Sequence, residues 1–133
     1  MQPHRPKSVV VWLSHARGDL ALARVQLGPR VMKELLCFHA QQAAEKAIKA
    51  VLIAHGIEPP RTHNITALIN LLPPEAPLRE DVLASRGLTS YAAITRYPGQ
   101  AGEVSEEDYR EAVRLAEAVV AWAEEMIGGQ AEV

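Results

Sequence analysis

The apolar residues of this chain recur with a helical period in segments that proline and glycine separate. The separating residues stand at 28–29, 56–60, 73–77 and 98–102. This pattern predicts five helices, near residues 8–27, 31–55, 64–72, 78–96 and 105–127. No segment alternates with period two for long enough to form a strand. We therefore predict an all-α fold, an antiparallel up-and-down four-helix bundle with an additional short helix, as a single domain over residues 1–133.

Several helix starts carry capping residues. Ser8 and Ser105 suit N-cap positions, and the acidic run after Ser105 suits the first turn of a helix. The stretch "RTHNIT" precedes the short third helix, so Thr62 or Asn64 is expected to cap it, with His63 ordering the same turn.

The predicted helix over 31–55 has an unusual polar side. One broad face is rich in alanine, which lets another helix approach closely. The opposite side carries polar residues between large apolar ones, namely Glu34, Leu35, Phe38, Gln41, Gln42, Glu45, Lys46, Lys49, Leu52 and Ile53. A face that only meets water does not need large apolar residues at both ends. Two interpretations remain, a solvated face or a surface for a ligand or partner. The i, i+4 pair Glu45–Lys49 would by itself contribute only about 0.2–0.5 kcal/mol.

The predicted last helix is apolar over about half its circumference, which is wider than one core contact needs. Its flanking stripe consists of Leu115, Val119, Trp122 and Met126. The stripe packs either on the first helix or against a second subunit, with Trp122 as the anchor of that contact. On the second interpretation we expect a homodimer.

Composition excludes several classes of protein. A chain of 133 residues can bury one core without disulfides, and its single cysteine, Cys37, cannot form an internal one. The formal net charge of −2 argues against a surface devoted to sequence-independent binding of nucleic acid. The five histidines show no metal-ligand spacing, so no metal is expected. No apolar run is long enough to span a bilayer and no signal peptide is evident, so we expect a cytoplasmic protein.

Four segments together resemble the HEPN domain family. They are "VVWLSHARGDLALARVQL", "FHAQQAAEKAIKAVL", "GIEPPRTHNITALINLL" and "YAAITRYPG", in the family's order and over nearly the whole chain. The resemblance implies a helical bundle related to the helical part of certain nucleotidyltransferases. It also implies a homodimer and pairing with a separately encoded minimal nucleotidyltransferase, often as a toxin–antitoxin-like couple.

Many HEPN proteins are metal-independent ribonucleases marked by an arginine followed four to six residues later by a histidine. The guanidinium steadies the phosphate and the imidazole moves the proton of the attacking 2′-hydroxyl. Here no arginine has a histidine at that spacing. The best candidate arginine, Arg96, is followed by Tyr97, whose ordinary pKa near 10 makes it a poor base at neutral pH. All histidines lie upstream, at His4, His15, His39, His55 and His63.

We therefore expect a HEPN protein without nuclease activity that binds a nucleotide such as ATP, or a nucleotidyltransferase partner, and needs no cofactor. The resemblance places the binding residues at Gln41, Glu45, Lys46, Lys49, His63, Arg96 and Tyr97. RNA is a substrate only under the alternative, a ribonuclease with an atypical site around Arg96 and Tyr97 or an upstream histidine. In a purely structural role, Arg96 would interact with the end of its helix before Pro98.

Overall fold

The computed structural model describes residues 7–94 and 103–131. Three long helices dominate this part of the chain, α1 (Lys7–Ala23), α2 (Lys33–Ala54) and α5 (Glu106–Ala131). The shorter elements are α3 (Ile65–Ile69), α4 (Glu80–Ala84) and the 3-10 helix η1 (Ser85–Ala93). The described residues contain no strand, so the predicted all-α bundle is confirmed.

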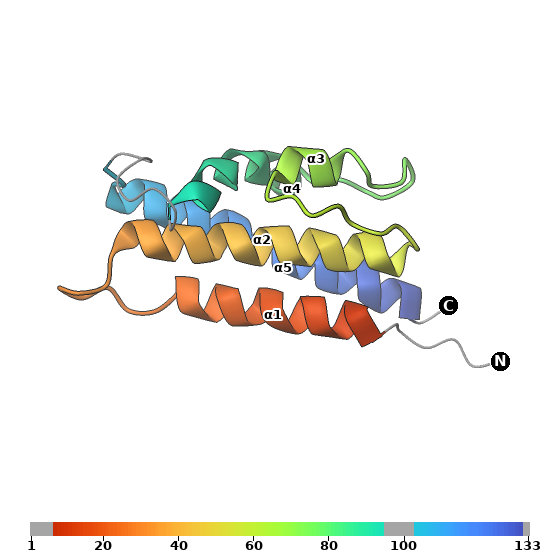
Figure 1. Ribbon diagram of the computed structural model, residues 1–133, viewed down its shortest axis with the longest axis horizontal. Coiled ribbons are helices and arrows are strands. Elements are labelled where there is room, and N and C mark those ends of the chain that lie inside the picture. The colour runs from red at the N-terminus through yellow and green to blue at the C-terminus, as the bar shows by residue number, and fades with distance from the viewer. Residues whose placement is uncertain (1–6, 95–102, 132–133) are drawn as a thin grey trace.

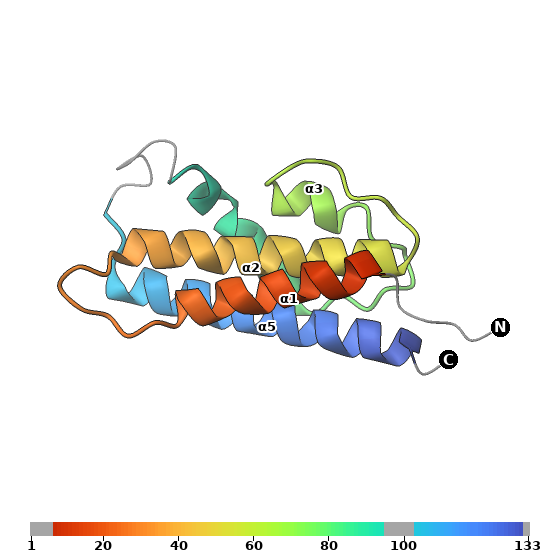
Figure 2. The same cartoon turned by 60° about the horizontal axis from the view of Figure 1, so that its bottom comes forward.

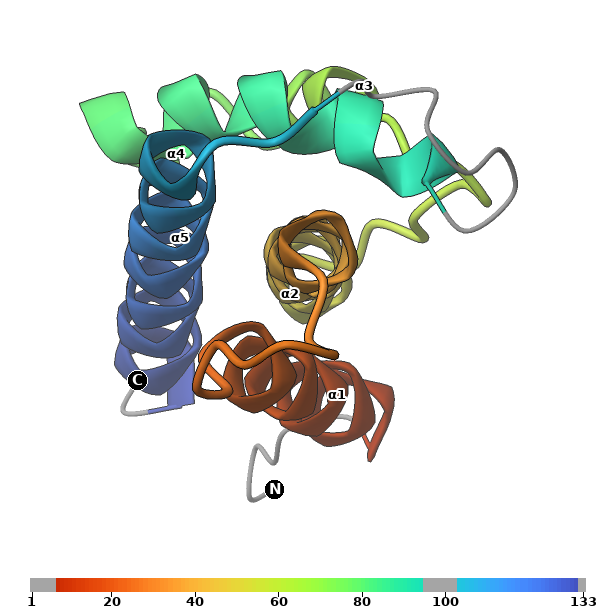
Figure 3. The ribbon, with the colours of Figure 1, turned by 90° about the vertical axis from the view of Figure 1, so that its left-hand side faces the viewer.

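The long helices pass up and down the length of the molecule. Helix α1 runs opposite to α2, and α5 runs in the same direction as α2 (Figure 1). The return path between α2 and α5 is made by α3, α4 and η1. Seen along the bundle, α4 and η1 cross over the side formed by α2 and α5, and α1 lies on the opposite side (Figure 3).

Two details of the helices differ from the prediction. Helix α1 begins at Lys7, so Ser8 lies inside the helix and is not its N-cap. The predicted helix over 78–96 consists of α4 followed by η1, which ends at Ala93. At their junction the Ser85 hydroxyl donates to the carbonyl of Val82 at 2.6 Å. Such local bonding offers the backbone an alternative to the α-helical ladder and is compatible with the tighter 3-10 turn.

The predicted capping residues of two other helices, Ser105 and Asn64, are confirmed. The Ser105 hydroxyl accepts from the backbone N–H of Asp108 at 2.9 Å, and the Asp108 carboxylate accepts from the N–H of Ser105 at 3.3 Å. This reciprocal pair satisfies two N–H groups at the start of α5. The Asn64 side chain caps α3 by accepting from Ala67 N at 3.2 Å.

Helix α2 lies at the centre of the core. Its alanine face is fully buried, with Ala40, Ala43, Ala44, Ala47 and Ala50 all inaccessible to solvent. These small side chains let the neighbouring helices approach the backbone of α2 closely. Cys37 is buried beside the same face, and burial raises the pKa of its thiol to about 11. The thiol is therefore neutral and behaves as a small apolar group.

The flanking stripe of α5 is covered by the chain itself, so the predicted subunit contact at this stripe needs correction. Leu115, Val119 and Trp122 are buried within the single chain, and Met126 packs half-buried against the same core. The Trp122 indole is only 1% exposed, and its N–H donates to the carbonyl of Pro77 at 2.9 Å. The segment before α4 and the rest of the core already cover this stripe. It is therefore an internal surface and leaves no anchor for a second subunit.

Candidate functional site

A carboxylate buried in the middle of α2 organises the polar side of that helix. Glu45 is 2% exposed, and its Oε2 accepts from the Lys49 ammonium at 2.8 Å. Its Oε1 lies 2.9 Å from His63 Nδ1 and accepts from the amides of Gln41 at 3.1 Å and Gln42 at 3.3 Å. One carboxylate thus holds four side chains, three from α2 and one from the segment before α3.

Two further contacts complete this cluster. The Gln41 amide also donates to the carbonyl of His63 at 3.1 Å, which ties the segment before α3 to α2. The Lys49 ammonium lies 5.2 Å from the ring centre of Trp12 on α1, a cation–π distance. No buried side-chain polar atom in the described ranges lacks a hydrogen-bond partner. The cluster therefore satisfies its own polar groups.

Opposing effects act on the Glu45 carboxyl group. Burial disfavours the charged form and acts to raise its pKa. Hydrogen bonds from Lys49, His63 and Gln41, together with the charge of Lys49, outweigh burial and lower the pKa below the usual range. Glu45 is therefore ionised at neutral pH, where it is the counter-ion of Lys49.

A second carboxylate joins α1 to α2 on the same side of the bundle. Asp19 is buried, with Oδ2 at 2.6 Å from the Lys46 ammonium and Oδ1 at 3.0 Å from His39 Nδ1. The Phe38 and His39 rings meet in an edge-to-face arrangement, with ring centres 5.3 Å apart. His39, Gln42 and Lys46 follow one another at helical spacing on α2. They therefore form one line beside the Glu45 cluster.

Accessibility divides these residues into two groups. Gln41, Glu45 and Lys49 are buried, so the interpretation of these three as a solvated face is wrong. His63 has 59% of its side chain exposed, His39 31% and Lys46 21%, and Gln42 is half-buried. We call these four residues the polar row. Among the described side chains of these two carboxylate clusters, those of the polar row could touch a ligand without rearrangement of the core.

The structure places five of the seven predicted binding residues together. Gln41, Glu45, Lys46, Lys49 and His63 lie on α2 or directly before α3. Arg96 and Tyr97 lie outside the described residues. Sequence reasoning missed Trp12 and Asp19, which come from α1. The sequence does show that Asp19 is an acidic residue next to apolar positions of α1. It does not show its partners, because His39 and Lys46 are remote in sequence.

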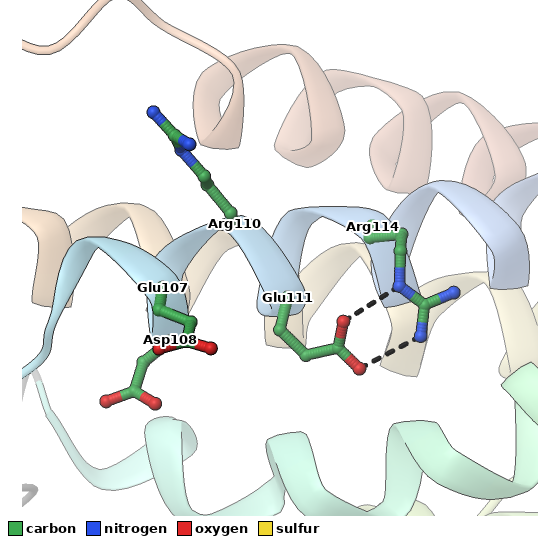
Figure 4. Close-up of a pocket in the computed structure, with 5 residues that line it drawn as sticks. All are labelled: Glu107, Asp108, Arg110, Glu111 and Arg114. Atoms are coloured by element: carbon green, nitrogen blue, oxygen red, sulfur yellow. Dashed lines mark hydrogen bonds and ion pairs between the residues drawn. The ribbon is translucent and has the colours of Figure 1, made fainter.

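Helix α5 carries an open hollow of different character. It is lined by Glu107, Asp108, Arg110, Glu111 and Arg114 (Figure 4). The Arg114 guanidinium donates to both carboxylate oxygens of Glu111 and also reaches Asp81. These bonds lower the pKa of Glu111 and raise that of Arg114. Arg114 thus joins Glu111 and Asp81 in a solvent-facing set of ion pairs along this hollow.

The residues described in the structure include no group of three or more His, Cys, Asp or Glu side chains placed to hold a metal ion. Within the same residues, no helix is both long and apolar enough to cross a membrane.

Comparison with known proteins identifies the family. The sequence profile of the HEPN domain matches residues 9–126. The chain belongs to the HEPN domain family. Two solved structures have the same fold. TT1696 from Thermus thermophilus is 32% identical, with a TM-score of 0.71 over 89% of this chain and 97% of that one. ST0689, described as an archaeal HEPN homologue, is 28% identical, with a TM-score of 0.64 over 90% and 97%. No curated protein matches the chain significantly.

Proposed function

We propose that this HEPN protein is the binding component, without nuclease activity, of a two-component system with a minimal nucleotidyltransferase. It acts as a homodimer that accepts a nucleotide or docks the partner enzyme. The observation that carries the proposal is the polar row, whose ionisable members are held by buried carboxylates at fixed positions. The missing arginine-to-histidine spacing supports a binding role over RNA cleavage.

The chemistry of the polar row favours an anionic ligand. Lys46 supplies a point charge. In both His39 and His63 the buried carboxylate contacts Nδ1, so Nε2 is the ring nitrogen that a ligand would meet. The carboxylates fix the side chains before the ligand arrives, which lowers the entropic cost of binding. Arg96 would add a planar fork for phosphate oxygens.

Calorimetric titration with ATP and AMP tests the small-molecule half of this proposal. We expect the triphosphate to bind more tightly than the monophosphate, and both to bind more weakly as ionic strength rises. Lys46→Ala and Arg96→Ala should each weaken ATP binding by about tenfold, the usual effect of losing a charged hydrogen bond. Arg110→Ala on α5 serves as a control cation and should leave affinity unchanged. Absence of heat with either nucleotide would leave partner docking as the function.

A second candidate function is a metal-independent ribonuclease, and one observation favours it. The Asp19 carboxylate is placed to accept from Nδ1 of His39, which would fix the tautomer whose Nε2 can take a proton. His39 is thus an upstream histidine already oriented for such a role. Under this alternative, RNA cleavage would disappear in both His39→Ala and Arg96→Ala variants.

A further inference from the structure

The edge of α1 that meets the polar side of α2 carries an aromatic ring beside the polar row. Helix α1 packs against α2 and runs in the opposite direction (Figure 2). At 100° per residue, Trp12, His15 and Asp19 share a sector of about 60° on α1. Asp19 binds Lys46 on α2. Trp12 meets Lys49, one turn further along the same helix.

Buried partners fix the Trp12 ring on one side. The Lys49 ammonium lies over the indole, 5.2 Å from the ring centre, and is itself held by Glu45 at 2.8 Å. Trp12 packs against the core but is only half-buried, so part of the indole meets solvent. Trp122, the other tryptophan of the chain, is 1% exposed. Trp12 is therefore the tryptophan that a ligand can reach without rearrangement of the core.

The spacing along α1 matches the shape of a nucleotide. Trp12 and Asp19 are seven residues apart, which corresponds to about 10 Å along a helix. Asp19 holds Lys46, the cation that the proposed function assigns to phosphate. An extended nucleoside triphosphate spans a similar length between its base and its terminal phosphate. A ligand whose phosphates lie at Lys46 would therefore reach Trp12 with its base.

The chemistry of an indole ring suits a base. Every nucleobase has a π face, and stacking on an aromatic side chain needs no pattern of hydrogen bonds. A purine stacks more strongly than a pyrimidine because its larger ring system overlaps more of the indole. His15 is exposed between Trp12 and Asp19 along the helix, at the level where the sugar would lie. Its imidazole offers a hydrogen-bonding group to the sugar hydroxyls.

We infer that Trp12 is the platform on which the base of a bound nucleotide stacks, and that this site takes purine nucleoside triphosphates. The inference rests on nucleotide binding at the polar row, the small-molecule half of the proposed function. It adds a residue of α1 to that site and gives it selectivity for the base. The charges of the polar row cannot supply this selectivity, because they act on phosphates, which all nucleotides share.

Calorimetric titration with ATP, CTP and inorganic tripolyphosphate tests the role of the ring. The wild-type protein should bind ATP more tightly than CTP. Trp12→Leu should weaken ATP binding by about tenfold, within the range measured for loss of base–aromatic stacking, and should leave tripolyphosphate binding unchanged. Trp12→Phe is the matched control, since it keeps an aromatic face and should retain ATP binding and the preference over CTP. Equal weakening of ATP and tripolyphosphate in Trp12→Leu, or no weakening of either, would overturn the inference.

Tryptophan fluorescence tests the contact in proteins that keep an aromatic ring at position 12. ATP should quench the emission of the wild type over the concentrations at which heat is released, whereas tripolyphosphate should bind without quenching. In Trp12→Phe the remaining emission comes from buried Trp122, so ATP should bind without quenching there. Heat from ATP with equal emission changes in the two proteins would refute stacking alone. Absence of heat with both ATP and tripolyphosphate would refute the nucleotide site itself, and the inference with it.

Discussion

At the scale of single residues, Glu45 has the largest structural role on the polar side of α2. A buried carboxylate must be compensated, and Glu45 is compensated by Lys49, His63 and two amides. Removal of one partner of a buried ion pair leaves the other charge without compensation. The stability of the fold therefore depends on a residue that looks like part of an ordinary surface pair in the sequence.

Glu45→Gln should destabilise the protein by about 3 kcal/mol at pH 7, because Lys49 would remain buried without its counter-ion. It should also change the response to acid. The folded-state pKa of Glu45 is lowered, so the unfolded chain binds more protons. Wild-type stability contributed by Glu45 is present above the unfolded pKa of about 4.3 and is lost as pH falls through the lower folded value.

Urea unfolding followed by circular dichroism from pH 7 to about pH 3 measures this contribution. The Glu45→Gln curve should be flatter than the wild-type curve in the acid range. Glu58→Gln, at an exposed position after α2, should follow the wild type. Parallel curves for wild type and Glu45→Gln would show that Glu45 has no lowered pKa.

At the scale of elements, α5 is fixed to the return path of the chain. Besides the Trp122 bond to Pro77, Arg79 pairs with Glu125 and Arg114 pairs with Asp81. Both ion pairs are solvent-exposed and contribute little to stability. Burial of apolar side chains at this junction, including Trp122 on α5 and Val82 on α4, therefore supplies most of the free energy that holds it together.

Substitutions at Trp122 should destabilise the fold without changing the oligomeric state of the folded protein. Trp122→Ala should cost about 3–5 kcal/mol through lost burial and a cavity. Trp122→Phe should cost less, since it loses the hydrogen bond, worth about 0.5–1.5 kcal/mol, and part of the volume. Unfolding in urea gives both values, with Met126→Leu as a volume-conserving control expected below about 1.5 kcal/mol. A Trp122→Phe variant that is fully folded but dissociated would restore the original subunit prediction.

At the scale of the whole molecule, one HEPN bundle presents two different surfaces. The polar row lies along α2 and the segment before α3, and α1 exposes the apolar side chains of Val10, Val11 and Leu22. Asp19 on α1 binds α2 at the boundary of these surfaces.

The purified protein should not cleave single-stranded or structured RNA above a matched blank, with or without divalent metal, because it lacks the arginine-to-histidine spacing. Gel analysis of labelled RNA measures this. Cleavage that disappears in Arg96→Ala, with unchanged circular dichroism, would support the ribonuclease alternative instead.

Patterns in the chain were enough to predict the helical class, the main breaks between helices and the HEPN resemblance. The helices and their breaks depend on local physics, since a period of 3.6 residues, a proline or a capping Asn64 or Ser105 acts within a few positions of the chain. The alanine face of α2 was predictable for the same reason. Helical spacing places those residues on one side whatever packs against them.

The packing of remote segments determines which polar residues of α2 are buried and whether the flanking stripe of α5 is free. Helical periodicity shows which residues share a face and does not show what covers that face. Buried Glu45 meets His63 from 18 residues away, and Asp19 meets Lys46 from 27 residues away. Trp122 is covered by Pro77, 45 residues earlier in the chain. These contacts form only in the folded bundle, so no local pattern in the sequence encodes them.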